Sequence, residues 1–186
     1  FHGASVGEIM SILPLIKKFE KDKSIKKILL SSSTVSSASI IAKKHLKKTT
    51  HIYYPFDVGF ICNNFLDFWK PKIAVFVDSE IWPNMYEKIK NKRIPLILIN
   101  ARITSKSFNR WQIFPSFAKR VFNNITIALP QNQESKNYLK ILGVKKIKFI
   151  GNLKYFKNDK KNLRTNFQKY FKNRKVFCAA STHYNE

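Results

Sequence analysis

Short apolar runs alternate with helix-like segments along most of this chain, and this alternation limits its fold more than any other feature of the sequence. Short continuous apolar runs are typical of strands that are buried on both faces of a parallel sheet. Such strands are predicted at 27–32, 51–54, 73–77, 95–100, 125–129 and 147–150. The helices predicted between them lie at 35–46, 58–69, 83–90, 114–122 and 131–142. Strands that alternate with helices predict right-handed βαβ units, and therefore an α/β fold with a Rossmann-like, doubly wound parallel sheet.

The two ends of the chain and one charged stretch suggest a domain boundary within a longer protein. Phe1 reads as the end of a buried strand, and Glu186 follows closely on a strand-like run, so we expect both ends to be internal. The segment 157–164 is polar and charged without apolar periodicity, which is typical of a linker. We therefore expect a Rossmann-like domain over 1–152, a linker and connecting helix over 153–174, and the start of a second α/β domain over 175–186.

The strong excess of basic residues has three possible origins. Lys and Arg number 35 against 11 Asp and Glu, for a formal net charge of +24. Compositional drift toward lysine is one explanation, and attraction to an anionic membrane or a phosphorylated substrate is another. Nucleic-acid binding is the third. The lysines are spread along the chain without a recognisable base-reading module, so we expect no nucleic-acid partner.

The sequence contains no signature of a metal site, a dinucleotide or a membrane span. Cys62 and Cys178 lie far apart in apolar stretches, without the spacing of zinc ligands or of a redox pair, so we expect reduced thiols and no metal site. The GxGxxG spacing of dinucleotide-binding loops is absent, and we expect no cofactor. No apolar run approaches the roughly 20 residues that a bilayer-spanning helix needs.

Ligands of open α/β sheets bind beyond the carboxyl ends of the strands, so the loops that follow strands are the candidate sites. The first is His2–Glu8 (HGASVGE), where a strand ends and a helix begins near Gly7. Glu8 would lie in the first turn of that helix, where backbone N–H groups stabilise a carboxylate. It is either a general base at the mouth of a cleft or an acid that only stabilises its helix. Pro14 lies within the apolar pattern of this helix and should kink it or mark its true start.

Two further loops offer hydroxyl, carboxylate and indole groups. Ser31–Thr34 supplies hydroxyls that either bind a sugar or phosphate, or cap a helix. Asp78–Asn84 (DSEIWPN) follows the clearest strand and places two carboxylates before Trp82. That tryptophan either stacks on a substrate or belongs to the core or its rim.

Two basic side chains follow later strands. Arg102 suits a carboxylate or phosphate, or else pairs with Asp78 or Glu80. Gly151–Lys154 (GNLK) puts a lysine at the predicted domain boundary, where it would neutralise charge that develops on a phosphate leaving group.

Taken in order, these loops resemble the motifs of the bacterial 3-deoxy-D-manno-octulosonic acid (Kdo) transferases. His2–Glu8 is similar to the family's H-x-x-S-x-G-E, and Asp78–Asn84 to its E-T-E-L-W-P-N. The remaining matches are Tyr54–Asp57, together with the preceding Tyr53, to Y-x-P-[YF]-D, Asn100–Arg102 to N-A-R, Gly151–Lys154 to G-N-L-K, and Ser181–His183 to S-T-H. The resemblance covers essentially all 186 residues.

The resemblance implies a GT-B glycosyltransferase, whose two Rossmann-like domains face a cleft. Such an enzyme transfers Kdo from CMP-Kdo to a lipid A precursor at the cytoplasmic face of the bacterial inner membrane, whose anionic surface is a further implied partner. Glu8 matches the general base toward the acceptor hydroxyl in an inverting reaction, and Asp78 and Lys154 match positions that stabilise the transition state. Implied substrate-binding residues are Ser5, Gly7, Glu80, Arg102, Asn152, Ser181, Thr182 and His183. No metal is implied.

The chain departs from the family pattern at several positions. Asp78 stands where the family usually has Glu, which is one methylene longer. Tyr155 and Phe156 follow Lys154 where Phe-Asp is common, and the usual Gly after His183 is absent. Most of the cytidine-binding elements that the family implies lie beyond residue 186, so the fragment alone is expected to be inactive.

Two hypotheses therefore make different structural predictions. A transferase requires that Glu8, Asp78, Glu80, Arg102 and Lys154 converge on one cleft edge. A non-catalytic basic α/β module, which binds nucleic acid or anionic membrane, predicts a lysine-rich surface away from the strand ends.

Overall fold

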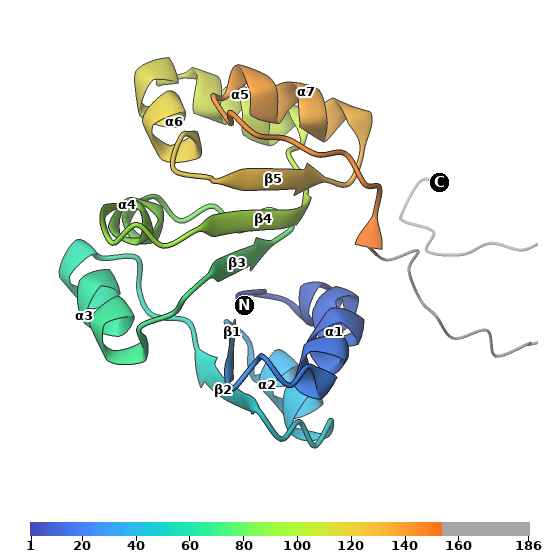
Figure 1. The fold of residues 1–186 in the computed structure, drawn as a ribbon. Coiled ribbons are helices and arrows are strands. Elements are labelled where there is room, and N and C mark those ends of the chain that lie inside the picture. Colours follow the sequence, from blue (N-terminus) through green and yellow to red (C-terminus); the bar gives the residue numbers. More distant parts are fainter. Residues whose placement is uncertain (154–186) are drawn as a thin grey trace, which may run out of the picture.

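The computed structural model describes residues 1–153, which form an α/β, Rossmann-like fold with helices on both faces of a parallel sheet (Figure 1). The strands are β1 (Ile28–Ser32), β2 (Thr49–Tyr53), β3 (Ala74–Val77), β4 (Leu96–Ala101) and β5 (Ile127–Pro130). The helices are α1 (Val6–Lys21), α2 (Val35–Ala42), α3 (Gly59–Trp69), α4 (Pro83–Asn91), α5 (Ser105–Gln112), α6 (Pro115–Phe122) and α7 (Gln133–Ile141). Within these residues no helix has the length and apolar character needed to cross a membrane. The predicted fold class is confirmed, whereas the predicted segment 175–186 and nearly all of 153–174 lie outside the described residues.

The segment 1–3 is inserted into the sheet between β1 and β3. His2 forms parallel bridges to Ser31 of β1 and to Phe76 of β3, and its backbone N–H donates to the carbonyl oxygen of Val75 at 2.8 Å. The resulting strand order is β2, β1, the segment 1–3, β3, β4, β5, with parallel pairing throughout. The chain first runs outward from segment 1–3 to β2, then returns to β3 and runs outward in the opposite direction. The strand order therefore reverses between segment 1–3 and β3, which makes this boundary the switch point of the sheet.

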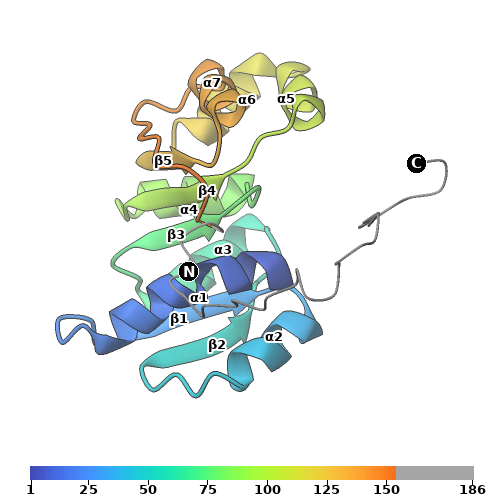
Figure 2. The ribbon, with the colours of Figure 1, turned by 90° about the vertical axis from the view of Figure 1, so that its right-hand side faces the viewer.

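Each face of the sheet has its own apolar core. Successive side chains of a strand point to opposite faces. Val75 and Val77 of β3 belong to the cluster formed with α1 and α2, whereas Phe76 belongs to the cluster formed with α3, α4, α6 and α7. Figure 2 shows α1 and α2 in front of the sheet, with α3 behind it. The two cores hold the strands rigidly, so the loops at the strand ends start from fixed positions.

Helix α1 begins at Val6, directly after its N-cap residue. Ser5 is the N-cap, and its side chain and that of Glu8 form a reciprocal capping box. The buried stripe of the helix is Ile9, Ile12, Leu13 and Ile16. Pro14 lies inside α1, on its exposed side, so it does not mark the start of the helix.

Two predicted helical regions differ from the structure. Helix α5 was not predicted, because its sequence (SKSFNRWQ) is mostly polar and none of its residues is buried. The helix predicted at 35–46 ends already at Ala42. The chain then turns, and His45 adopts the left-handed conformation at φ 46°, which cannot continue a right-handed helix.

The strand predicted at 147–150 was wrong in extent. Only Ile147 pairs with the sheet, through a single parallel bridge to Ala128. Phe149 and Ile150 are exposed, so the apolar character of this run does not reflect burial in the sheet.

Candidate active site

Two loops leave the sheet at its switch point. One connects the segment 1–3 to α1, and the other, residues 78–82, connects β3 to α4. Because His2 pairs with Phe76 in a parallel register, both loops start from neighbouring positions at the carboxyl edge of the sheet. Open α/β sheets bind their ligands at this place. The candidate site is therefore built from the loops that the sequence singled out first and third.

Glu8 is held by the loop in front of α1. Its Oε2 accepts hydrogen bonds from the backbone N–H of Ala4 at 2.7 Å and from that of Ser5 at 3.4 Å. The Ser5 hydroxyl in turn accepts the backbone N–H of Glu8 at 3.3 Å. No backbone N–H of residues 1–153 reaches the other carboxylate oxygen, Oε1. One oxygen of Glu8 thus caps the helix, while the second takes no part in the cap.

The electrostatic environment makes Glu8 a stronger base than an ordinary glutamate. Burial raises the pKa of Glu8, and the negative charge of Glu80 raises it further. The hydrogen bonds from Ala4 and Ser5 oppose this shift because they stabilise the ionised form. Two carboxylates that are 72 residues apart in the sequence therefore lie within electrostatic reach of each other.

Glu80 is fixed by two ring N–H groups that bind the same oxygen. Its Oε2 lies 3.1 Å from Nε2 of His2 and accepts a hydrogen bond from Nε1 of Trp82 at 2.8 Å. The Tyr86 hydroxyl donates to the backbone carbonyl of Glu80 at 2.7 Å. Trp82 is half-buried at the rim of the core, and its indole N–H is engaged by Glu80. The Glu80 side chain therefore has a defined orientation, with Oε1 outside these contacts.

His2 connects this carboxylate to β1 and to an aromatic cluster. Its Nδ1 lies 3.1 Å from the Ser31 hydroxyl, and its ring stacks on Tyr54 with centroids 3.9 Å apart. Burial lowers the pKa of His2, although Glu80 opposes this shift. The hydroxyl of Tyr54 is buried and has no hydrogen-bond partner among the described residues. His2 belongs to a sequence motif, but nothing local in the sequence signals its pairing with Glu80.

Asp78 and Asn100 end adjacent strands in an unusual backbone conformation. Their φ angles are 61° and 51°, in the left-handed region that Asp and Asn tolerate better than most residues. Both residues are buried. The backbone N–H of Arg102 donates to the carbonyl oxygen of Asp78 at 3.1 Å, and the Ser79 hydroxyl donates to the carbonyl oxygen of Arg102 at 2.9 Å. The loops that follow β3 and β4 are thus tied together at the carboxyl edge.

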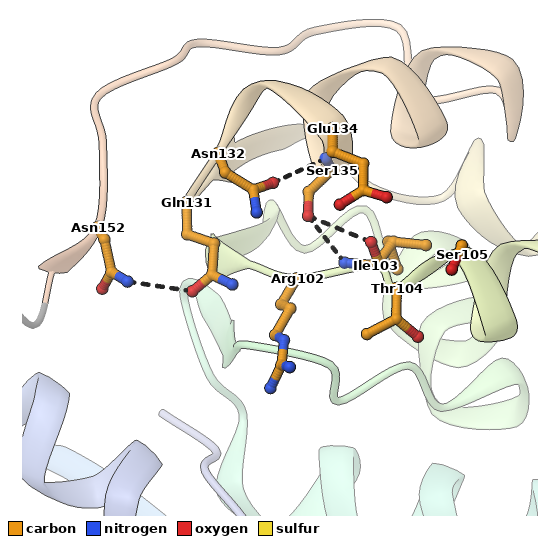
Figure 3. Close-up of a pocket in the computed structure, with 9 residues that line it drawn as sticks. All are labelled: Arg102, Ile103, Thr104, Ser105, Gln131, Asn132, Glu134, Ser135 and Asn152. Atoms are coloured by element: carbon orange, nitrogen blue, oxygen red, sulfur yellow. Dashed lines mark hydrogen bonds between the residues drawn. The ribbon is translucent and has the colours of Figure 1, made fainter. Parts of the chain in front are cut away.

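A polar pocket of about 360 Å³ opens next to this edge (Figure 3). Its lining consists of Arg102, Ile103, Thr104, Ser105, Gln131, Asn132, Glu134, Ser135 and Asn152. Gln131 Oε1 accepts hydrogen bonds from Asn152 at 3.3 Å and from Asn100 at 3.5 Å, and the Asn100 side chain accepts the backbone N–H of Leu153 at 3.1 Å. These contacts fix residues 152–153 against the end of β4. The exposed Arg102 side chain extends away from α7 in Figure 3. Sequence analysis missed Gln131, which lies in a loop without a recognised motif.

The remaining candidate residues have simpler surroundings. A side chain added at Gly7 would meet only the Ser5 hydroxyl, at 3.9 Å, so space alone does not require glycine there. Thr34 caps α2 through the backbone N–H of Ser37, as the capping interpretation predicted. The residues that lie outside the described part of the chain are Lys154, Ser181, Thr182 and His183. Among residues 1–153, no three His, Cys, Asp or Glu side chains are grouped so that they could hold a metal ion.

Comparison with known proteins identifies relatives over nearly the whole chain. Residues 1–157 match the family model described as 3-deoxy-D-manno-octulosonic-acid transferase (kdotransferase). The chain is 35% identical to the 3-deoxy-D-manno-octulosonic acid transferase of Rickettsia prowazekii, over 98% of this chain and 40% of that protein. It is 26% identical to the enzyme of the same name from Haemophilus influenzae, over 100% of this chain and 45% of that protein. The chain therefore spans less than half the length of these relatives.

A solved structure shares the fold. The UDP-GlcNAc 2-epimerase from Neisseria meningitidis, determined with UDP-GlcNAc bound, superposes with a TM-score of 0.58. The match covers 82% of this chain and 46% of that chain, at 16% sequence identity. At that identity the likeness extends to the Rossmann-like fold and not to the site.

Proposed function

The chain belongs to the 3-deoxy-D-manno-octulosonic acid (Kdo) transferase family, and on this premise we propose that it is part of an enzyme that transfers Kdo from CMP-Kdo to a lipid A precursor. In this proposal residues 1–152 form the acceptor-binding domain, and residues 175–186 begin the domain that binds the nucleotide sugar. The reaction takes place at the cytoplasmic face of the bacterial inner membrane, where an anionic surface presents the acceptor. The length of the relatives supports a second domain, since the chain covers only 40–45% of them.

Glu8 is the residue on which the mechanism rests. Its carboxylate lies at the switch point, has one oxygen anchored and one available, and has a raised pKa. We assign it the role of general base. It takes the proton of the acceptor hydroxyl as that oxygen forms a bond to the anomeric carbon of Kdo. The bond from this carbon to the CMP phosphate breaks on the opposite side, and CMP leaves with the electron pair, so the configuration inverts.

Other residues of the carboxyl edge stabilise the charges that develop during this reaction. Asp78 and Lys154 stabilise the transition state in this proposal, and Lys154 neutralises the charge that develops on the departing phosphate. Asp78 is buried and follows the last residue of β3 in the left-handed conformation. Ser5 and Gly7 shape the loop that presents Glu8.

The polar pocket beside β4 suits the phosphorylated part of the acceptor. Arg102 is exposed at its edge, and Asn152 is held in place through Gln131. Arginine binds phosphate through several N–H groups in one plane. Glu80 and the residues Ser181, Thr182 and His183 complete the proposed substrate-binding set, the last three from the donor side.

The test compares Glu8→Gln with the parent sequence in the complete protein. Glutamine at this position can still accept the N–H groups of Ala4 and Ser5, so the capping box survives while the base is removed. We expect kcat to fall by about 10²- to 10⁴-fold, which is the usual contribution of a general base. The measurement is transfer of Kdo from CMP-Kdo to a lipid A precursor, with acceptor binding measured separately.

Glu87→Gln is the matched control, because Glu87 is an exposed acid on α4 that lies outside the proposed site. It should transfer Kdo at nearly the rate of the parent sequence. Glu8→Ala removes both the base and the cap, so any loss of stability beyond that of Glu8→Gln measures the cap. Unchanged transfer by Glu8→Gln would remove Glu8 from the mechanism, and absence of transfer by the parent protein would refute the proposed function.

A further inference from the structure

His2 is buried in a position that an unpaired charge would not tolerate. Only 2% of its surface is exposed. Its ring stacks on Tyr54 and lies against the rings of Phe76 and Trp82, with centroids 5.5 Å and 6.2 Å away. Aromatic surroundings of this kind remove water from the imidazole and favour its neutral form.

The hydrogen bonds of His2 identify the tautomer of that neutral ring. An ionised carboxylate can only accept, so Nε2 must carry a proton in order to bind Oε2 of Glu80 at 3.1 Å. In a neutral ring Nδ1 then has no proton and can accept from the Ser31 hydroxyl, which lies 3.1 Å from it and 3.3 Å from the carbonyl oxygen of Phe1. The neutral ring therefore donates its Nε2–H to Glu80, while its Nδ1 lies next to Ser31 of β1.

Glu80 is thereby anchored without being neutralised. Both groups that bind its Oε2, the His2 imidazole and the Trp82 indole, are uncharged donors. Within residues 1–153, no Lys or Arg forms an ion pair with Glu80. The negative charge of Glu80 therefore raises the pKa of Glu8.

We propose that His2 is a positioning residue for the transfer reaction, which holds Glu80 through a neutral N–H so that an uncompensated carboxylate stays beside Glu8 with one oxygen directed to the substrate. The two carboxylates are anchored in the same way, each through Oε2, and these hydrogen bonds do not involve Oε1 of either residue. Glu8 takes the proton of the attacking hydroxyl, and Glu80 keeps Glu8 basic. This inference rests on the proposed function for its catalytic part, while its electrostatic part is measurable without any transfer.

Several other groups influence the titration of this pair. Tyr54 and Tyr86 lie within electrostatic reach of Glu80, and burial raises the pKa of both tyrosines so that they remain neutral. On the α1 side the charged neighbour is Glu8 itself.

The first experiment follows the carboxyl carbon of Glu8 by NMR in the complete protein labelled with 13C-glutamate. Glu80→Gln removes the charge but keeps an oxygen that can accept from His2 and Trp82, so the pKa of Glu8 should fall toward its usual value. Glu134→Gln, which changes a carboxylate on α7, should leave the Glu8 titration where it is. An unchanged Glu8 titration in Glu80→Gln would overturn the proposal.

The second experiment separates the N–H group of His2 from its ring. His2→Gln places an amide N–H where Nε2 was, and should preserve both the Glu8 titration and most of the transfer rate. His2→Phe keeps the stacking on Tyr54 but removes the donor, so the Glu80 side chain is held by the Trp82 N–H alone. We then expect kcat to fall by about 10²-fold, with little change in acceptor KM, because misplaced catalytic groups cost rates of this order. Equal rates in His2→Phe and the parent protein would overturn the proposal, as would loss of the Glu8 shift in His2→Gln.

The pH profile distinguishes positioning from a merely structural role. The acid limb of kcat/KM reports the pKa of the base in the free enzyme. In Glu80→Gln this limb should move to lower pH together with the NMR titration of Glu8. A limb that stays in place while the NMR titration moves would overturn the catalytic part of the proposal. If the titrations shift as expected but the parent protein transfers no Kdo, the proposed function fails and the electrostatic role of His2 is supported.

Discussion

The two edges of the sheet carry opposite kinds of side chain. The loops that follow strands within residues 1–153 contain the charged residues Asp57, Asp78, Glu80 and Arg102. The loops that precede the strands, at 22–27, 43–48, 70–73, 92–95, 123–126 and 142–146, contain 13 Lys and Arg residues against the single acid Asp22. Both edges belong to the same α/β unit, so the fold itself does not impose this segregation.

The difference shows where a lysine-rich composition is tolerated. At the amino edge the basic side chains lie mostly exposed, where water and salt screen their mutual repulsion. At the carboxyl edge the acids engage specific partners, as Asp57 and Glu80 do. A lysine-rich surface away from the strand ends is also what a basic binding module predicts. It occurs here in a member of a transferase family, so that surface alone does not identify a binding module.

The largest expected effect comes from a neutral substitution at the carboxyl edge. Asp78→Asn keeps a residue that tolerates φ 61° but removes the carboxylate. We expect kcat to fall by about 10²- to 10³-fold, as when one group that stabilises the transition state is lost. The amino-edge substitution Lys26→Gln also changes one charge and should leave kcat nearly unchanged. Comparable losses in the two variants would break the distinction between the edges.

A smaller effect is expected when a carboxylate that orders the carboxyl edge is removed. Asp57 accepts the backbone N–H groups of Asn84 at 3.0 Å and Met85 at 2.8 Å, in the first turn of α4. Asp57→Ala should therefore lower the free energy of unfolding by about 0.5–2 kcal/mol, the usual cost of a lost helix cap. Urea denaturation measures this loss. Asp57→Asn, which retains an accepting oxygen, should recover part of it.

The buried His2 should make stability depend on pH. Its pKa is lowered in the folded chain, so the unfolded chain binds the proton first as the pH falls below about 6.5. The contribution of His2 to stability is therefore complete above that pH and is lost as the pH falls through the folded pKa. The urea midpoint is measured at pH 7.5 and at pH 5.5. The difference between these two midpoints should be smaller for His2→Gln than for the parent sequence. Glu8, whose pKa is raised, acts in the opposite direction but equally in both proteins. Equal pH dependence in both would show that His2 is not held neutral.

The smallest effect is expected at an exposed ion pair near the amino edge. Lys92 in the loop before β4 pairs with Asp67 of α3, and the Asp67 side chain is largely exposed. Asp67→Asn should cost about 0.2–1 kcal/mol, the range of surface ion pairs, and less in high salt. The comparison with Asp57→Ala is direct, since each substitution removes one aspartate. A larger loss at Asp67 than at Asp57 would contradict the contrast between the edges.

Much of the fold could be predicted from sequence because the buried strands are short apolar runs and the helices between them are amphipathic. Helix α5 escaped prediction because its apolar residues, Phe108 and Trp111, are too few to form a periodic pattern and only partly buried. The run at 147–150 has the composition of a strand, but it makes one bridge at the margin of the sheet. An apolar run predicts a strand, but its composition does not show whether a partner strand is present to pair with it.

The candidate site divides in the same way. The position of Glu8 in the first turn of a helix followed from local spacing, and the capping box was the physical reason. The link between His2 and Glu80 could not be predicted, because it depends on segment 1–3 entering the sheet beside β3. The pairing of Gln131 with Asn152 likewise depends on where the chain passes after β5.

Segment 1–3 lies in the middle of the sheet, so the geometry of the site depends on the pairing of the two halves of the sheet. The backbone N–H of His2 donates to Val75 on one side, and that of Gly3 donates to Ser31 on the other, at 2.8 and 3.1 Å. These hydrogen bonds join the half of the sheet that contains β1 and β2 to the half that contains β3 to β5. A fluctuation that breaks the bond between His2 and Val75 separates segment 1–3, which leads to Glu8, from β3, which leads to Glu80. Amide hydrogen exchange at His2 and Gly3 would therefore follow how often the assembled carboxylate pair comes apart, residue by residue and without substrate.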